Sequence, residues 1–95
     1  MKFEWDPSKN ERNIRKHHLD FADSWKVFQG PMLTQLDDRF EYEEMRTVSI
    51  GFLEELIVVL VFVEIADDII RPISFRKANK NERERFYKYL ANRLG

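Results

Sequence analysis

The chain has 95 residues, enough for one domain with one modest hydrophobic core and too few for two. Hydrophobic residues make up 43% of it and aromatic residues 14%, which excludes a disordered chain and predicts a soluble globular protein. There is no cysteine, which excludes disulfide bonds, thiolate zinc sites and cysteine nucleophiles. We therefore expect residues 1–95 to form a single domain that is stabilised by packing alone.

The net charge of -1 conceals a strong division along the chain. Residues 31–70 hold two basic and ten acidic side chains, a net of -8, whereas residues 71–95 hold eight basic and two acidic ones, a net of +6. A segment as basic as 71–95 can bind phosphates locally although the whole chain is nearly neutral. The alternative is a solvated polar face with chance clustering of charge.

Neither a membrane span nor a secretion signal is visible in the sequence. The longest apolar run, Leu56–Val63, has eight residues, whereas a membrane-spanning helix needs about 20. The first seven residues carry acidic side chains and no apolar core of the kind that a signal peptide has. We expect a cytoplasmic protein that makes no membrane contact.

The chain opens with a short strand and a helix. Phe3–Trp5 alternates apolar and polar side chains, as a half-buried strand does. Asp6 followed by Pro7 is typical of a helix N-terminus, with an acceptor at the cap and proline at the first helical position. This helix should cover Pro7–His17, with Ile14 as its main apolar contact.

A second helix and a weak strand should follow. Aromatic residues recur at spacings of four and three within Phe21–Phe28, and Asp20 can cap that segment. Met32–Leu36 has the composition of a weak strand. The acidic stretch Asp37–Glu44 is expected to be a loop or a fraying hairpin end.

The centre of the chain predicts three strands in an antiparallel meander. Val48–Phe52 alternates with period two, so one face of that strand should be buried. Leu56–Ile65 is almost continuously apolar, which is typical of a central strand covered on both faces. Glu54-Glu55 and Asp67-Asp68 serve as tight turns, and Ile69–Phe75 forms the last strand.

Pro72 lies inside that last strand and cannot donate a hydrogen bond to a neighbour, so it indicates an edge position, a bulge, or a place where the strand needs no N–H donor. Under strict alternation Arg71 lies on the opposite face from Ser74 and Arg76. A bulge at Pro72 would instead bring all three to one face. The sequence leaves both arrangements open.

A basic helix should close the chain over Lys80–Leu94. Asn79 followed three residues later by Glu82 is typical of a capping box. Phe86, Leu90 and Leu94 form an apolar stripe that can pack on the sheet, whereas the other sides of the helix are strongly basic. The element order is β-α-α-β-β-β-β-α, which predicts an α+β fold with helices packed on a small antiparallel β-sheet.

The order and spacing of several short blocks resemble BrnT-type toxins of bacterial toxin–antitoxin systems. The first half contributes Phe3, Glu4, Trp5, Asp6, Lys9, Asn10, Asn13, Arg15, Lys16, His17, Phe21, Val27 and Phe28. The second half contributes Glu44, Arg46, Ile50, Gly51, Arg71, Ile73, Ser74, Arg76, Lys77, Ala78, Glu82, Arg83 and Tyr87. Together these blocks cover nearly the whole chain.

The resemblance implies a RelE-like fold and a metal-independent endoribonuclease that inhibits translation and needs no cofactor. It also implies inhibition by a cognate ribbon-helix-helix (BrnA-like) antitoxin. The complex would repress its own operon, and operator DNA would be contacted through the antitoxin rather than through this chain.

The chain departs from the family pattern at four places. His18 stands where relatives usually have a glycine that ends the helix, so a left-handed helix end there would carry a steric cost. The loop around Phe40 lacks a histidine that relatives often have, Ile65-Ala66 replaces an acid–arginine pair, and Pro72 replaces an isoleucine. These departures put activity in doubt more than they do the fold.

Metal-free RNA cleavage needs a base for the 2′-hydroxyl, a cation for the charged phosphorane and a donor for the leaving oxygen. Arg71 and Arg76 are our candidates for a phosphate clamp, because guanidinium groups can hold a phosphate through two hydrogen bonds. Ion pairs with the acidic middle of the chain are the alternative. Lys77, Lys80 and Arg83 extend this basic strand-to-helix region and should bind RNA.

Three further candidates each have a structural alternative. His17 could act as a base or acid near neutral pH, or could cap the helix C-terminus. Tyr87 could donate to a phosphate or stack on a base, or could pack in the core. Arg46 could contact a phosphate or pair with Glu43 and Glu44.

The leading hypothesis is thus an endoribonuclease toxin. Its rival is a catalytically inactive interaction module that keeps the antitoxin interface and acts as a co-repressor. No phosphate-loop, zinc or dinucleotide motif is present in the sequence.

Overall fold

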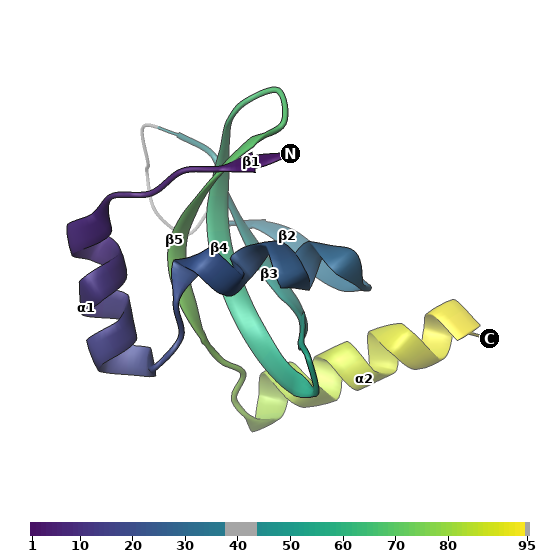
Figure 1. Ribbon diagram of the computed structural model, residues 1–95. Coiled ribbons are helices and arrows are strands. Elements are labelled where there is room, and N and C mark those ends of the chain that lie inside the picture. Colours follow the sequence, from purple (N-terminus) through teal and green to yellow (C-terminus); the bar gives the residue numbers. More distant parts are fainter. Residues whose placement is uncertain (38–43, 95) are drawn as a thin grey trace.

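The computed structural model describes residues 1–37 and 44–94 (Figure 1). Phe40 and Glu43, which the sequence singled out, lie outside the described residues. The elements follow the predicted order, as β1 (Lys2–Phe3), α1 (Pro7–His17), η1 (Phe21–Gln29), β2 (Met32–Asp37), β3 (Arg46–Leu53), β4 (Leu56–Ala66), β5 (Ile69–Lys77) and α2 (Lys80–Leu94). The predicted α+β class is confirmed.

The five strands form one sheet in the order β1-β5-β4-β3-β2. The predicted antiparallel meander of three strands is confirmed for β3 to β5, and β2 extends it by pairing antiparallel with β3. β1 joins the outer edge of β5 in parallel, with Phe3 opposite Ile70. The sheet is therefore antiparallel except at this edge.

The boundaries of β1 and β2 differ from the sequence-based expectation. β1 covers Lys2–Phe3 rather than Phe3–Trp5, and Trp5 instead packs edge-on against Phe21. Asp37 is the last residue of β2 and is buried, whereas a loop was expected there. Its position opposite Arg46 in the register explains the longer strand, because a cationic partner makes a carboxylate tolerable at that place.

The second helix is a 3₁₀-helix rather than an α-helix. Phe21, Ser24 and Val27 are its buried residues, and a spacing of three puts them on one face of a helix with three residues per turn. The Ser24 hydroxyl donates to the Phe21 carbonyl oxygen at 2.7 Å, so the buried hydroxyl of Ser24 has a hydrogen-bond partner. Trp25, one of the regularly spaced aromatic residues of this segment, is 47% exposed as a result.

η1 packs against the sheet face that carries Val58, Leu60 and Phe62. Gly51 of β3 makes the approach possible, because a Cβ atom at that position would lie 2.8 Å from the Val27 Cγ1 atom. This close contact determines how near η1 lies to the sheet, and so the thickness of the hydrophobic core between them.

α2 packs on the opposite face, where Phe86 is fully buried beside Ile50 and Val59. The predicted capping box is confirmed, since the Glu82 backbone N–H donates to Asn79 Oδ1 at 2.9 Å and the Asn79 N–H donates to Glu82 Oε1 at 2.8 Å. Leu90 joins this core, whereas the side chain of Leu94 lies outside the described residues. α2 covers one end of the sheet and leaves the rest of this face open (Figure 1).

α1 is anchored by Asn13 rather than by Ile14, which is 36% exposed. The Asn13 amide donates to the carbonyl oxygens of Phe75 and Leu19, both at 2.9 Å, and its Oδ1 accepts the Phe75 N–H at 3.0 Å. β1 is too short to cover this part of the β5 edge, and buried backbone groups need partners. The side chain of Asn13 thus makes the hydrogen bonds to β5 that the backbone of a neighbouring strand would otherwise make.

Candidate active site

A bulge in β5 decides which side chains share the open sheet face. Pro72 pairs with Phe62 and Ser74 pairs with Val61, so Ile73 is the extra residue. Because cross-strand partners share a face, Arg71 lies on the same side as Ser74 and Arg76. The alternative in which a bulge brings the three together is confirmed.

The register arranges this face in rows that run across the strands. Nearest α2 is the row of Leu33, Ile50, Val59 and Arg76, and next to it is the row of Gln35, Val48, Val61 and Ser74. At the far end of the face Asp37 pairs with Arg46 and Val63 with Arg71, and one further step of the β3–β4 register beyond the Thr47–Phe62 pair joins them into a third row. The outer rows lie four residues apart on β4, roughly 13 Å at the usual rise of a strand. Arg71 and Arg76 therefore occupy opposite ends of the face. Their guanidinium groups cannot bind the same phosphate unless both side chains extend far toward each other.

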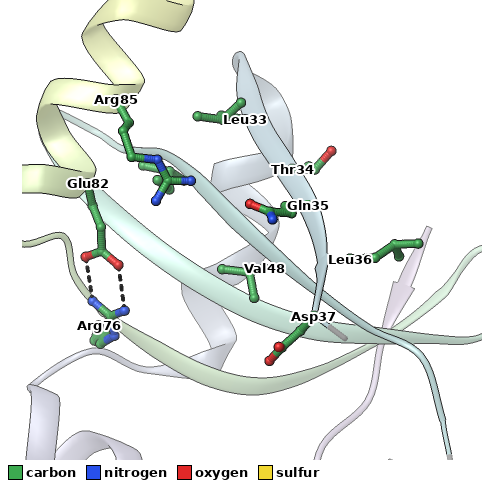
Figure 2. Close-up of a pocket in the computed structure, with 10 residues that line it drawn as sticks. Leu33, Thr34, Gln35, Leu36, Asp37, Val48, Arg76, Glu82 and Arg85 are labelled. Carbon is green, nitrogen blue, oxygen red and sulfur yellow. Dashed lines mark hydrogen bonds and ion pairs between the residues drawn. The ribbon is translucent and has the colours of Figure 1, made fainter. Parts of the chain in front are cut away.

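Arg76 is held by Glu82 of α2 (Figure 2). Its two terminal nitrogens donate to the two carboxylate oxygens, each at 2.8 Å, in a parallel pair of bonds. The hydrogen bonds from Arg76 and, less strongly, from the Asn79 backbone lower the pKa of Glu82, although its burial opposes them. Because the capping box also holds Glu82, the first turn of α2 fixes the orientation of the Arg76 guanidinium.

His17 ends α1 at the same end of the sheet. Burial lowers its pKa, and the neighbouring charges of Lys16, Arg76 and His18 lower it further. A depressed pKa keeps the imidazole neutral at pH 7, which is the form that can accept a proton. The helix-ending role belongs to its neighbour, because His18 is in the left-handed conformation (φ 61°) and its backbone N–H donates to the Ile14 carbonyl oxygen.

The far end of the face holds the other two candidate arginines. Arg46 and Arg71 belong to one row and are separated only by β4, roughly 10 Å at the usual strand spacing. Arg71 pairs with Glu44 at 3.6 Å, and both side chains are about two-fifths exposed (42% and 39%). Arg46 lies opposite Asp37 across the β2–β3 register. Arg46 and Arg71 thus share the far end of the face, whereas His17 and Arg76 lie at the end nearest α2.

The remaining candidates lie away from this face. Lys77 pairs with Val58, so its side chain is on the η1 side of the sheet. At 100° per residue, Lys80, Arg83 and Tyr87 lie on one flank of α2 and Glu82 and Arg85 on the other. Arg83 donates to the Ala78 carbonyl oxygen at 2.9 Å, and Tyr87 is 57% exposed. Tyr87 is therefore not part of the core.

A hollow of about 300 Å³ lies between β2 and α2 on the open face. Its apolar floor is formed by Leu33, Val48 and Ile50, and its polar rim includes Gln35, Arg76 and Arg85. In Figure 2 Arg85 extends from α2 over the sheet toward Gln35. The sequence reasoning missed Arg85 and Gln35; a helical wheel centred on the buried Phe86 would have separated Arg85 from Arg83.

Two asparagines that the sequence analysis left without a role position the site. Asn13 joins α1 to β5, as described above. The Asn10 amide donates to Asp20 Oδ1 and its Oδ1 accepts the Phe21 N–H, both at 2.9 Å. Together they fix the end of α1, and with it His17, against the strand that carries Arg76. Within residues 1–37 and 44–94, no three histidine or carboxylate side chains group closely enough to hold a metal ion.

Comparisons with known proteins agree with this architecture. Residues 5–82 match the family model of the ribonuclease toxin BrnT of type II toxin–antitoxin systems. The crystal structure of the Brucella abortus ribonuclease toxin BrnT is similar at a TM-score of 0.63 and 28% sequence identity, over 84% of this chain and 99% of that one. No curated protein sequence matches the chain. None of the helices in the described part is long and apolar enough to cross a membrane. The chain therefore belongs to the BrnT family of ribonuclease toxins of type II toxin–antitoxin systems.

Proposed function

We propose that this chain cleaves RNA without a metal ion and inhibits translation by doing so, acting in the cytoplasm. The observation that carries the proposal is that His17 ends α1, which packs against β5, close enough to Arg76 for the charge of the guanidinium to lower the pKa of the imidazole. One group has a lowered pKa and can take a proton, and the other is a cation of fixed orientation. These are two of the three groups that metal-free cleavage requires.

In the proposed step the neutral imidazole of His17 takes the proton of a ribose 2′-hydroxyl. The 2′-oxygen then attacks the adjacent phosphorus atom, and the bond from phosphorus to the 5′-oxygen breaks. The leaving oxygen takes up a proton from solvent, and the product ends in a 2′,3′-cyclic phosphate. Arg76 stabilises the additional negative charge of the phosphorane, aided by the orientation that Glu82 imposes.

The other basic residues would bind RNA away from the scissile phosphate. Arg46 and Arg71 lie at the far end of the face, where they would contact a second phosphate of the same strand. Lys80, Arg83 and Tyr87 share the outer flank of α2 and would contact RNA that continues past the helix, and Lys77 would do so from the opposite side of the sheet. Their contribution is electrostatic attraction rather than chemistry.

As a type II toxin, the protein has an antitoxin protein as its partner. We propose that this partner is a BrnA-like ribbon-helix-helix protein and that it supplies the contacts to operator DNA. The near-neutral charge of the toxin supports that division of labour, because a net charge of -1 gives little attraction to duplex DNA.

One observation favours the rival function, an inactive co-repressor. Arg71 and Arg76 each pair with a carboxylate, so neither offers its full charge to a phosphate in this state. A protein that keeps such pairs closed would bind its antitoxin without cleaving RNA.

The test is incubation of the purified chain with a long RNA in excess EDTA, with analysis of fragment ends. We expect 2′,3′-cyclic phosphate or 3′-phosphate ends, a loss of rate on the order of 10²-fold for Arg76→Ala, and a comparable loss for His17→Ala at an unchanged melting temperature. Arg12→Ala on the exposed side of α1 and His18→Gly are the matched controls. Equal rates for Arg76→Ala and Arg12→Ala would refute the assignment of Arg76. Intact RNA, together with normal growth of cells that express the free chain, would favour the co-repressor.

A further inference from the structure

The middle row of the open face has no role in the chemistry proposed above, yet two of its residues, Gln35 and Val48, line the hollow. Val48 and Val61 are half-buried in the centre of the row, and Gln35 and Ser74 stand at its two ends. Arginines flank it on both sides, Arg76 in the row next to α2 and Arg71 at the far end. An apolar strip between two cationic ends is complementary to a nucleotide chain, whose phosphates are anionic and whose bases have flat, apolar faces.

We infer that this hollow binds one nucleobase of the RNA and that Gln35 contributes to base preference. The inference rests on the proposed function, because it assigns the cationic ends of the face to phosphates of the same strand. The base would lie on Val48, with its edge toward the Gln35 amide. That amide can donate and accept side by side, as nucleobase edges do.

The dimensions and the roof of the hollow support a base as the occupant. Its volume of about 300 Å³ accommodates a single planar ring system. Arg85 reaches over the floor from α2, and an arginine guanidinium is a common stacking partner for an unpaired base. The ends of the face lie roughly 13 Å apart along β4, enough for at least one nucleotide between the two bound phosphates.

Charge in the hollow also favours a nucleotide over an acidic or a basic peptide. Glu82 neutralises Arg76 in part, so the rim retains the positive charge of Arg85, which is exposed, while Asp37 is buried at one corner. Asp37 lies opposite Arg46 in the register, so its charge is balanced by a residue beside the hollow and one excess positive charge remains at the rim. That charge suits one phosphodiester, whereas an extended acidic partner would need more.

Binding of mononucleotides tests the inference separately from cleavage. The probes are the four nucleoside 5′-monophosphates and ribose 5-phosphate, titrated into the protein and followed by NMR. We expect nucleotides to bind at least about fivefold more tightly than ribose 5-phosphate, with unequal affinities for the four bases. Gln35→Ala should make the affinities for the four nucleotides equal. Val48→Phe should fill the space above the floor of the hollow, so that nucleotides bind no more tightly than ribose 5-phosphate. Gln29→Ala, which changes the other described glutamine, should change neither.

Equal binding of ribose 5-phosphate and nucleotides would overturn the inference, as would Gln35→Ala with unchanged base preference. Because these titrations need no turnover, an inactive protein that still discriminates bases through Gln35 would refute the proposed cleavage and leave the nucleobase site standing. For an active protein, the nucleotides found at the fragment ends supply a second readout, which Gln35→Ala should broaden without a matching fall in kcat.

Discussion

Replacement of Asn13 by alanine should destabilise the protein severely, although an asparagine on a helix is seldom a core residue. The side chain is 8% exposed and makes three hydrogen bonds, two to the backbone of Phe75 and one to the Leu19 carbonyl oxygen. At about 1 kcal/mol for each bond, the loss amounts to about 3 kcal/mol, because alanine leaves the buried backbone groups of Phe75 without partners. A domain of this length has a total stability of roughly 5–14 kcal/mol.

Urea unfolding and thermal unfolding measure that loss. The melting temperature should fall by roughly 12–24 °C, given about 4–8 °C for each kcal/mol in a domain of this size. Asn92→Ala, at an exposed position of α2, is the matched control and should change stability little. Asn13→Asp should cost at least as much as Asn13→Ala, because it loses both donors and places a charge beside two carbonyl oxygens. A loss below about 1 kcal/mol for Asn13→Ala would refute the anchoring of α1 by this amide.

Two further predictions concern the ends of helices. His18→Gly should stabilise the protein by about 0.5–1 kcal/mol in thermal unfolding, because it removes a left-handed cost of about 1–2 kcal/mol and adds about 0.5–1 kcal/mol of chain entropy to the unfolded state; unchanged or reduced stability would mean that His18 makes compensating contacts. Glu82→Gln should lower stability most at neutral pH, and its difference from the wild type should shrink as the pH falls below the ordinary glutamate value of 4.5. The sign follows from the lowered pKa of Glu82, since a carboxylate of this kind stabilises the fold above its unfolded pKa and ceases to do so once it is protonated. A difference in unfolding free energy that stays constant between pH 7 and pH 3 would contradict the Arg76–Glu82 pair as its source.

Periodicity and turn chemistry predicted the elements of the fold because each depends on neighbouring residues. The capping box needs only Asn79 and Glu82, three positions apart, and both hairpin turns lie where paired acids interrupt the apolar runs. The 3₁₀ geometry of η1 was missed because its aromatic residues fit an α-helical spacing. The buried set of Phe21, Ser24 and Val27 has a period of three, and a serine does not mark itself as buried in a sequence.

The candidate site was less predictable, because it depends on register and on contacts between distant segments. No local pattern distinguishes Asn13 as a substitute for a strand, since its partner Phe75 is 62 residues away. The bulge at Ile73 shifts the facing of Arg71, and Pro72 indicated only that some irregularity was present. Similarly, the charge of the segment 71–95 indicated a basic helix but not that Glu82 and Arg85 face the hollow while Arg83 and Tyr87 face away.

The two carboxylates that pair with the arginines of the open face are not equivalent, and this difference bears on how RNA would enter. Glu44 reaches Arg71 at 3.6 Å with both side chains well exposed, and exposed pairs of this kind contribute about 0–1 kcal/mol. An incoming phosphate can therefore replace Glu44 at little cost. Glu82 is 15% exposed in its side chain, receives two bonds of 2.8 Å from Arg76 and is also held by the Asn79 backbone. Its displacement would break the N-terminal cap of α2 as well as the ion pair. We therefore expect RNA to exchange carboxylate for phosphate at the Arg71 end of the face, and to meet at Arg76 a guanidinium that stays in place.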